Sequence, residues 1–304
     1  MNLVVRTPNW LGDLVMSLPS ISLLEKKYPQ MSLWSHSRVS GLIPVFFPSL
    51  KLYTDNRIKG AGFTNLLLMT DSFRSALQGF MSGIPERIGY GTDMRSLLLT
   101  KAISHPSDRR HHHSDDYMFL ASETGATGNA VTPKPSVEAE GSPHIAYFAG
   151  ARYGSAKRWS RFPELARHLC ESTDLPAVFY GSSEEDDVLR AVSSEVPGAC
   201  VRTDLALPDL VSHLLSAVLT VGNDSGGVHV SAAIGIPTVT VFGSSSPVWT
   251  APLGRFTETV TSDRACSPCF KRRCPYGIPE CLNDISSEVV LTACEELMEK
   301  ADRI

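Results

Sequence analysis

The sequence lacks any apolar run long enough to cross a bilayer, and it has no excess of positive charge. Its longest apolar stretches, such as 66–69 and 238–242, are only as long as a strand. The 28 Lys and Arg residues against 32 Asp and Glu give a formal net charge of −4, which argues against binding of nucleic acid through a general basic field. The first residues also lack a basic segment followed by a long apolar one, so we expect no signal peptide and a cytoplasmic location.

Three familiar signatures of catalytic α/β proteins are also missing. No G-x-G-x-x-G follows the first apolar stretch, and "GARYGSAK" at 150–157 lacks the spacing of a P-loop. "GNDSGG" at 222–227 does not have the spacing of a G-x-S-x-G nucleophile elbow. The absence of these three motifs argues against a dehydrogenase, a P-loop NTPase and a hydrolase.

Cysteine occurs in an odd number, seven, which favours a reducing compartment over a disulfide framework. Four of the seven have C-x2-C-x4-C-x6-C spacing: Cys266, Cys269, Cys274 and Cys281. Four thiols this close in sequence would suit a structural zinc, although the usual second C-x2-C pair is absent. The alternative is a set of small thiols that pack a loop.

The chain alternates short strand-like runs with amphipathic stretches, which is typical of a parallel sheet covered by helices. The first half has "LVVR", "MSLWS" and "NLLLM", followed in turn by helical stretches at 13–27, 38–47 and 72–82. Residues 124–143 are poor in large apolar side chains and contain three prolines, so they predict a linker. The alternation restarts at 144–150, and we therefore expect two Rossmann-like domains in tandem.

A polar turn at 222–229 follows one strand of the second half and precedes a short helix. The N–H groups at such a helix start favour a phosphate, and the small Ser225, Gly226 and Gly227 would let it approach. His229, on the first helical turn, would reach the same anion. The alternative is that Asp224 or Ser225 only caps the helix.

A second anion-suited loop follows the first strand of this half. It carries Lys157, a point charge for a diphosphate, and two such loops in one domain suggest a nucleoside diphosphate. After the next strand, Glu184 or Glu185 would suit the hydroxyls of a ribose, although acids at a helix start are equally explained by the helix dipole.

The residues alone do not decide the role of two further features, Asp13 and the three histidines at 111–113. Asp13 stands where a helix begins, as a lone acid that is either matched to the dipole or chemically active. The three adjacent histidines at 111–113 cannot all point one way on a regular element, so a single metal bound by all three is not expected.

Four blocks of the sequence resemble glycosyltransferase family 9, the ADP-heptose:lipopolysaccharide heptosyltransferases, most closely the heptosyltransferase II type. They are "TPNWLGDLVMSLPSI" (7–21), "IPERIGYGTDMRSLLLT" (84–100), "GARYGSAKRWSRFPELA" (150–166) and "VGNDSGGVHVSAAIGIPTVTVFGSSSP" (221–247). They stand in the family's order and span nearly the whole chain. Ala149 departs from the pattern, because many members have proline there.

The resemblance implies a GT-B fold, with two Rossmann-like domains facing each other across a cleft, and inverting transfer of heptose from ADP-heptose. By motif, Asp13 matches the general base that deprotonates the acceptor hydroxyl, and Lys157 matches the residue that neutralises the diphosphate. Glu185 matches a ribose-contacting position. The nucleotide-binding turn is matched by Asp224, Ser225, Gly226 and His229, beside Gly227.

The resemblance also implies which part of the chain binds which substrate. We expect an acceptor-binding domain over 1–135, a nucleotide-sugar-binding domain over 136–285, and a helix within 286–304 that packs back on the first domain. The acceptor would be of the heptosyl-Kdo2-lipid A type, met at the inner face of the inner membrane. Neither a cofactor nor a catalytic metal is expected. Candidates for a basic acceptor-binding face are Arg87, Arg95, Lys101, Arg109 and Arg110.

Three alternatives stay open at this point. A family 9 enzyme could move another sugar or use another acceptor, because specificity lies in the site and not in the fold. A non-catalytic sugar-nucleotide-binding protein would have no need to keep Asp13, Lys157 and Asp224 together. An epimerase of similar fold would not predict the "NWLGD" block.

Overall fold

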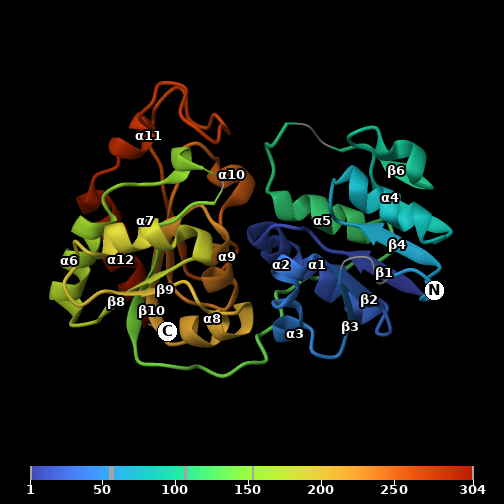
Figure 1. Ribbon diagram of the computed structural model, residues 1–304, viewed down its shortest axis with the longest axis horizontal. Helices are drawn as coiled ribbons and strands as arrows, with labels where there is room; N and C mark the ends of the chain where they lie inside the picture. The colour runs from blue at the N-terminus through green and yellow to red at the C-terminus, as the bar shows by residue number, and fades with distance from the viewer. Residues whose placement is uncertain (1, 55–57, 106–107, 153, 303–304) are drawn as a thin grey trace. The chain divides into compact units, whose positions relative to one another are not determined.

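Two parallel six-stranded sheets form the cores of the two halves of the chain (Figure 1). The computed structural model describes residues 2–54, 58–105, 108–152 and 154–302. It divides into two units, Met1–Ser136 and Val137–Ile304, and the division falls inside the predicted linker.

The first unit has the sheet order β3-β2-β1-β4-β5-β6. Its strands are β1 (Leu3–Arg6), β2 (Ser32–Ser35), β3 (Lys51–Thr54), β4 (Asn65–Leu68), β5 (Glu86–Tyr90) and β6 (Lys101–Ile103). Its helices are α1 (Leu11–Lys27), α2 (Ser37–Ser40), α3 (Ile43–Phe46), α4 (Phe73–Met81), the 3-10 turn η1 (Arg95–Leu98) and α5 (His113–Ser122).

The apolar runs that predicted strands in this half are the central strands. β1, β2 and β4 are buried along their whole length, as parallel strands covered on both faces must be. The predicted helix at 13–27 is α1, whereas the stretch at 38–47 divides into the two short helices α2 and α3. α5 packs against α1, and this contact joins the end of the unit to its beginning.

The second unit repeats the plan with the sheet order β12-β11-β10-β7-β8-β9. Its strands are β7 (His144–Phe148), β8 (Ala177–Tyr180), β9 (Cys200–Arg202), β10 (Ala217–Asn223), β11 (Thr238–Val241) and β12 (Thr257–Val260). Its α-helices are α6 (Phe162–Thr173), α7 (Asp186–Ser193), α8 (Leu207–Leu214), α9 (Gly226–Ala233), α10 (Pro247–Thr250), α11 (Glu280–Asn283) and α12 (Ser287–Asp302). Two 3-10 turns, η2 (Ser155–Lys157) and η3 (Ser183–Glu185), precede α6 and α7.

The last helix, α12, packs on the sheet of the second unit. α12 packs against α6 and against β10, β11 and β12, and its apolar side chains Val290, Cys294 and Leu297 are buried in the core of the second unit. Its buried face is thus accounted for by the sheet that precedes it in the chain. This packing belongs to the second unit, and the expected packing of the last helix on the first domain stays a prediction.

No helix within the described residues combines the length and the apolar character that a bilayer span requires.

Candidate active site

The sheet order of the second unit brings the two predicted nucleotide loops together. β7 and β10 are neighbours, although the chain passes through β8 and β9 between them, so the sheet has its topological switch point there. Open α/β sheets bind ligands outside the carboxyl ends of the strands that flank such a point. Residues 149–158 follow β7 and residues 224–226 follow β10, so both loops lie where a ligand is expected.

Asn223, the last residue of β10, ties these two loops to each other. Its Nδ2 donates to the carbonyl oxygens of Ala149 (2.8 Å) and Gly150 (3.3 Å), and its Oδ1 accepts from the backbone N–H of Trp159 at 3.0 Å. The side chain is fully buried. Our sequence reasoning missed Asn223. Its signal was an amide at the end of an apolar strand, where a buried polar group must find partners.

Lys157, Asp224 and His229 meet at the start of α9. Nζ of Lys157 lies 2.5 Å from Oδ2 of Asp224, and Nε2 of His229 lies 3.6 Å from Oδ1. Burial by itself would raise the pKa of Asp224, but the hydrogen bond from His229 and the charge of Lys157 outweigh it and hold this pKa below its usual range. Asp224 is therefore a buried anion that anchors a cation and an imidazole.

The turn before α9 does not behave as a simple helix cap. Ser225 is the N-cap residue, but its side chain makes no capping hydrogen bond, and Asp224 is engaged with Lys157. Ser225 Oγ and His229 Nδ1 are buried and have no hydrogen-bond partner among the described residues. Buried polar atoms are rarely left in this state unless a ligand or water completes them. The capping alternative for Ser225 and Asp224 is thus not supported.

Gly227 has a packing role that the sequence did not indicate. A Cβ at this position would overlap the ring of Phe148, the last residue of β7. The glycine therefore lets α9 approach the sheet closely, in addition to any closeness to a phosphate.

Glu185 lies at the carboxyl end of β8, one strand further along the same edge. Its Oε2 accepts from the backbone N–H and the hydroxyl of Ser182, at 3.0 and 2.8 Å, in a capping box. Its Oε1 lies over Gly150, where a Cβ would overlap it. Glu184 instead pairs with Arg152 at 2.7 Å. Glu185 is the acid held beside the loop after β7, and its contact with a ribose stays a prediction.

Asp13 lies in the first turn of α1, directly after β1, and it is half-buried. The switch point of the first sheet is between β1 and β4, so Asp13 stands at the ligand-binding edge of its own unit. Burial and, after it, the charge of Asp13 raise the pKa of Tyr117 on the neighbouring helix α5. Tyr117 and Asp13 therefore lie within electrostatic reach of each other.

Two of the three histidines at 111–113 contact one carboxylate, and the third does not. Nε2 of His111 and Nδ1 of His113 contact the carboxylate of buried Asp116 at 2.8 and 2.7 Å. His112 instead caps α5, with its Nδ1 accepting from the N–H of Ser114. Nε2 of His113 also lies 2.9 Å from the hydroxyl of Tyr117. This histidine–Asp116 cluster fixes the start of α5 next to α1.

Arg95 does not belong to the predicted basic face, because its side chain is buried. This side chain is fully buried, and its guanidinium donates to the carbonyl oxygens of Tyr90 and Thr70 and contacts Asp71 at 3.2 Å. It joins the ends of β4 and β5 and cannot bind an external acceptor.

The other basic candidates differ in availability. Arg87 donates to the carbonyl oxygens of Leu98, Ile84 and Pro85, so its guanidinium also serves the fold. Lys101 pairs with Glu123 at 2.6 Å. Arg109 and Arg110 are exposed, and their role in acceptor binding stays a prediction.

The cysteine segment does not form a metal site in the part of the chain that the structure describes. No group of three or more His, Cys, Asp or Glu side chains there is arranged to hold a metal ion, and Cys266, Cys269, Cys274 and Cys281 are all free thiols. The structural-zinc hypothesis for these four is therefore not supported by the geometry.

The cysteine segment instead packs against the loop after β7 and the loop after β11. The carbonyl oxygen of Arg272 accepts from the N–H of Ala156, and the N–H of Phe270 donates to the carbonyl oxygen of Ser244 at 2.6 Å. A Cβ at Gly154, whose φ is +151°, would overlap the backbone of Arg272. The segment thus fixes the position of the loop that carries Lys157.

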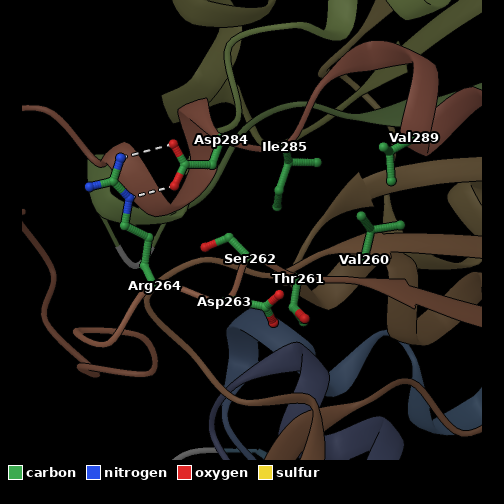
Figure 2. A pocket seen from close by; sticks show the side chains of 8 residues that line it. All are labelled: Val260, Thr261, Ser262, Asp263, Arg264, Asp284, Ile285 and Val289. Atoms are coloured by element: carbon green, nitrogen blue, oxygen red, sulfur yellow. Dashed lines mark hydrogen bonds and ion pairs between the residues drawn. The ribbon is translucent and has the colours of Figure 1, made fainter.

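A pocket of about 480 Å³ lies at the carboxyl end of β12. Figure 2 shows the Arg264–Asp284 ion pair at one side and the apolar Val260, Ile285 and Val289 at the other. None of the residues predicted from the sequence lines it. It lies two strands from β10, at the same edge of the sheet.

Comparison with known proteins gives the family. Residues 54–278 match glycosyltransferase family 9 (heptosyltransferase). The chain is 27% identical to lipopolysaccharide heptosyltransferase 2 of Salmonella typhimurium and 26% identical to that of Escherichia coli, over 98% of this chain and 99% of each relative.

Solved structures show the same fold. The structure of E. coli ADP-heptose LPS heptosyltransferase II superposes with a TM-score of 0.83 at 23% identity, covering 99% of this chain and all of that one. A family 9 glycosyltransferase from Veillonella parvula gives 0.81 at 19%, covering 98% and 97%. The expected GT-B fold is thereby confirmed. With its two Rossmann-like units and the family match over most of its length, the chain belongs to glycosyltransferase family 9, the heptosyltransferases.

Proposed function

We propose that this glycosyltransferase moves a heptose from ADP-heptose to the inner core of lipopolysaccharide, onto an acceptor of the heptosyl-Kdo2-lipid A type. The observation that carries the proposal is the cluster at the start of α9. There a held cation, Lys157, adjoins two buried polar atoms, Ser225 Oγ and His229 Nδ1, that have no partner in the described part of the chain. The names of the full-length relatives support the choice of sugar and acceptor.

In this proposal, the diphosphate of the donor lies at the N-terminus of α9. Backbone N–H groups at Gly226 and Gly227 donate to it, and the helix dipole favours its charge. The ammonium of Lys157 is kept at this place by Asp224, so the cation is positioned before the donor arrives. Glu185, one strand beyond the loop after β7, accepts hydrogen bonds from the ribose hydroxyls.

The transfer proceeds as a single displacement at the anomeric carbon. Asp13 accepts the proton of the acceptor hydroxyl while the oxygen of that hydroxyl forms the new bond to the anomeric carbon. The bond from the anomeric carbon to the diphosphate oxygen breaks, and ADP leaves with the bonding electron pair. Lys157 and the N–H groups of α9 stabilise the charge that develops on ADP, so we propose that no metal cofactor is required.

The acceptor is amphiphilic, and we propose that the enzyme meets it at the inner face of the inner membrane. α4 and η1 contact each other. Large apolar side chains are exposed on these two elements and at the residue that precedes η1: Phe80, Met81, Leu97 and Met94. Met94 and Leu97 are 85% and 88% exposed, so the fold itself leaves these side chains in water. Such a group of exposed apolar side chains suits a surface that rests on a membrane.

The test is transfer with purified components. The protein is incubated with ADP-heptose and a truncated core acceptor, and the product is analysed by mass spectrometry and by NMR of the new linkage. We expect addition of one heptose with anomeric configuration opposite to that of the donor. A retained configuration would overturn the single displacement, and faster transfer from another nucleotide sugar would overturn the donor assignment.

A further inference from the structure

The carboxyl end of β11 carries two hydroxyl groups that the mechanism above does not use. Ser244 and Ser245 are 1% and 6% exposed, and the Oγ atom of each is buried with no hydrogen-bond partner among the described residues. A buried hydroxyl without a partner is costly, and native proteins retain few of them. Two in succession at a ligand-binding edge need an explanation.

These hydroxyls stand directly beside the diphosphate site. β11 is the neighbour of β10, with Val241 paired to Asn223, and the N–H of Asp224 donates to the carbonyl oxygen of Val241 at 3.3 Å. The chain therefore leaves β11 next to the turn that begins α9, and Ser244 and Ser245 follow within four residues.

The backbone that carries the two serines is held in place. The carbonyl oxygen of Ser244 accepts from the N–H of Phe270, and the carbonyl oxygen of Gly243 accepts from the hydroxyl of Ser267, both at 2.6 Å. A Cβ at Gly243 would lie 2.6 Å from Cγ of Leu282 in the core, so this turn packs closely. Both serine hydroxyls are thus presented from a fixed framework, which suits recognition of a defined ligand.

The groups along the carboxyl edge follow the order of a sugar nucleotide. Glu185 follows β8, Lys157 follows β7, and Ser225 follows β10, with Ser244 and Ser245 after β11; in the sheet these strands are consecutive. Three strand spacings of about 4.8 Å give roughly 14 Å from β8 to β11, long enough for an extended donor. The edge presents an acid, then a cation at a helix start, then neutral hydroxyls.

We propose that Ser244 and Ser245 form the subsite for the sugar moiety of the donor, on the β11 side of the diphosphate. This rests on the proposed function. A serine hydroxyl both donates and accepts, so it matches the hydroxyls of a polyhydroxylated sugar, whereas it adds no charge for a phosphate. The two serines bind the sugar, and the groups at β7, β10 and β8 bind the nucleoside diphosphate.

The experiment compares two ligands on one variant. Calorimetric titrations with ADP and with ADP-heptose are made on the wild type and on Ser244→Ala combined with Ser245→Ala. We expect about a tenfold loss of affinity for ADP-heptose, since two neutral hydrogen bonds are removed, and less than a twofold change for ADP. Equal loss for both ligands, or no loss for ADP-heptose, would overturn the proposal.

A matched control separates a ligand role from a structural one. Thr240, inside β11, also has a buried hydroxyl without a partner in the described chain, but it lies within the strand. Thr240→Val should change neither affinity. The melting temperature of the unliganded serine variant should stay the same or rise, because it no longer buries two unpaired hydroxyls. A clear fall in this melting temperature would show that the two serines stabilise the fold and would overturn their role as a sugar subsite. If the wild type binds no ADP, the proposed function itself fails.

Discussion

The ammonium of Lys157 and the carboxylate of Asp224, 67 residues apart in sequence, lie 2.5 Å apart at the start of α9. Asp224 is buried and is held as an anion by Lys157 and His229. Asp224 therefore holds the ammonium of Lys157 beside the first N–H groups of α9. A diphosphate bound there, as proposed, would meet a cation that is already in position, so little of its binding energy would be spent on ordering the lysine.

Lys157→Ala should weaken ADP binding by about 10- to 100-fold, because a charge-assisted hydrogen bond to the diphosphate is lost. Titration calorimetry on folded protein measures this directly. Lys101→Ala serves as the control, since Lys101 pairs with Glu123 in the first unit and should not affect ADP. An unchanged ADP affinity in Lys157→Ala would remove the lysine from the donor site.

Asp116→Asn should reduce the acid sensitivity of folding. Burial would raise the pKa of Asp116, but hydrogen bonds from His113 and His111 and the nearby His105 lower it overall. A carboxyl with a lowered folded-state pKa stabilises the protein above its unfolded pKa of about 3.9, and this contribution is lost as pH falls through the folded-state value.

Urea unfolding at pH 5.5 and pH 3 checks the sign. The wild type should lose more of its unfolding free energy between these two values than Asp116→Asn does. An equal loss in both proteins would show that the histidine–Asp116 cluster does not hold the carboxylate ionised.

Met94→Ser with Leu97→Ser should weaken attachment to membranes. Both side chains are almost wholly exposed, so the change should leave the melting temperature nearly unaltered while it removes apolar area from the proposed membrane face. Cosedimentation with vesicles of anionic phospholipid measures the effect, and Tyr276→Ser, an exposed site in the second unit, is the control. The same sedimentation in wild type and double variant would rule out this face.

The sequence predicted the central strands well and the edge strands poorly. β1 and β10 are buried strands, so they are nearly continuous apolar runs that a reader of the sequence can recognise. β3, β9 and β12 are short and partly exposed, and their residues "KLYT", "CVR" and "TETV" lack an apolar signal. Their pairing depends on a neighbouring strand and not on their own composition.

The residue types of the candidate site could be predicted from the sequence, but the contacts between these residues could not. Lys157 and Asp224 stood out in the sequence, yet their ion pair depends on the adjacency of β7 and β10, which only the sheet order reveals. Arg95 was misjudged because arginine is usually exposed, and here backbone carbonyls at two strand ends satisfy its guanidinium. Ser244 and Ser245 gave no signal, since serine after a strand is common in loops.

Asp13 is the residue that we propose as the general base of heptose transfer from ADP-heptose. Its position after β1, at the switch point of the first sheet, puts a half-buried carboxylate where an open α/β sheet binds its ligand. Asp71→Asn provides a matched control, because Asp71 follows β4 at the same edge and contacts Arg95.

The most direct measurement is kcat for transfer to the truncated core acceptor in Asp13→Asn, together with its affinity for ADP. We predict that kcat falls by about two to four orders of magnitude while ADP affinity changes less than twofold, and that Asp71→Asn loses less than tenfold in kcat. Turnover near the wild-type value in Asp13→Asn would contradict the assignment of Asp13 as the base.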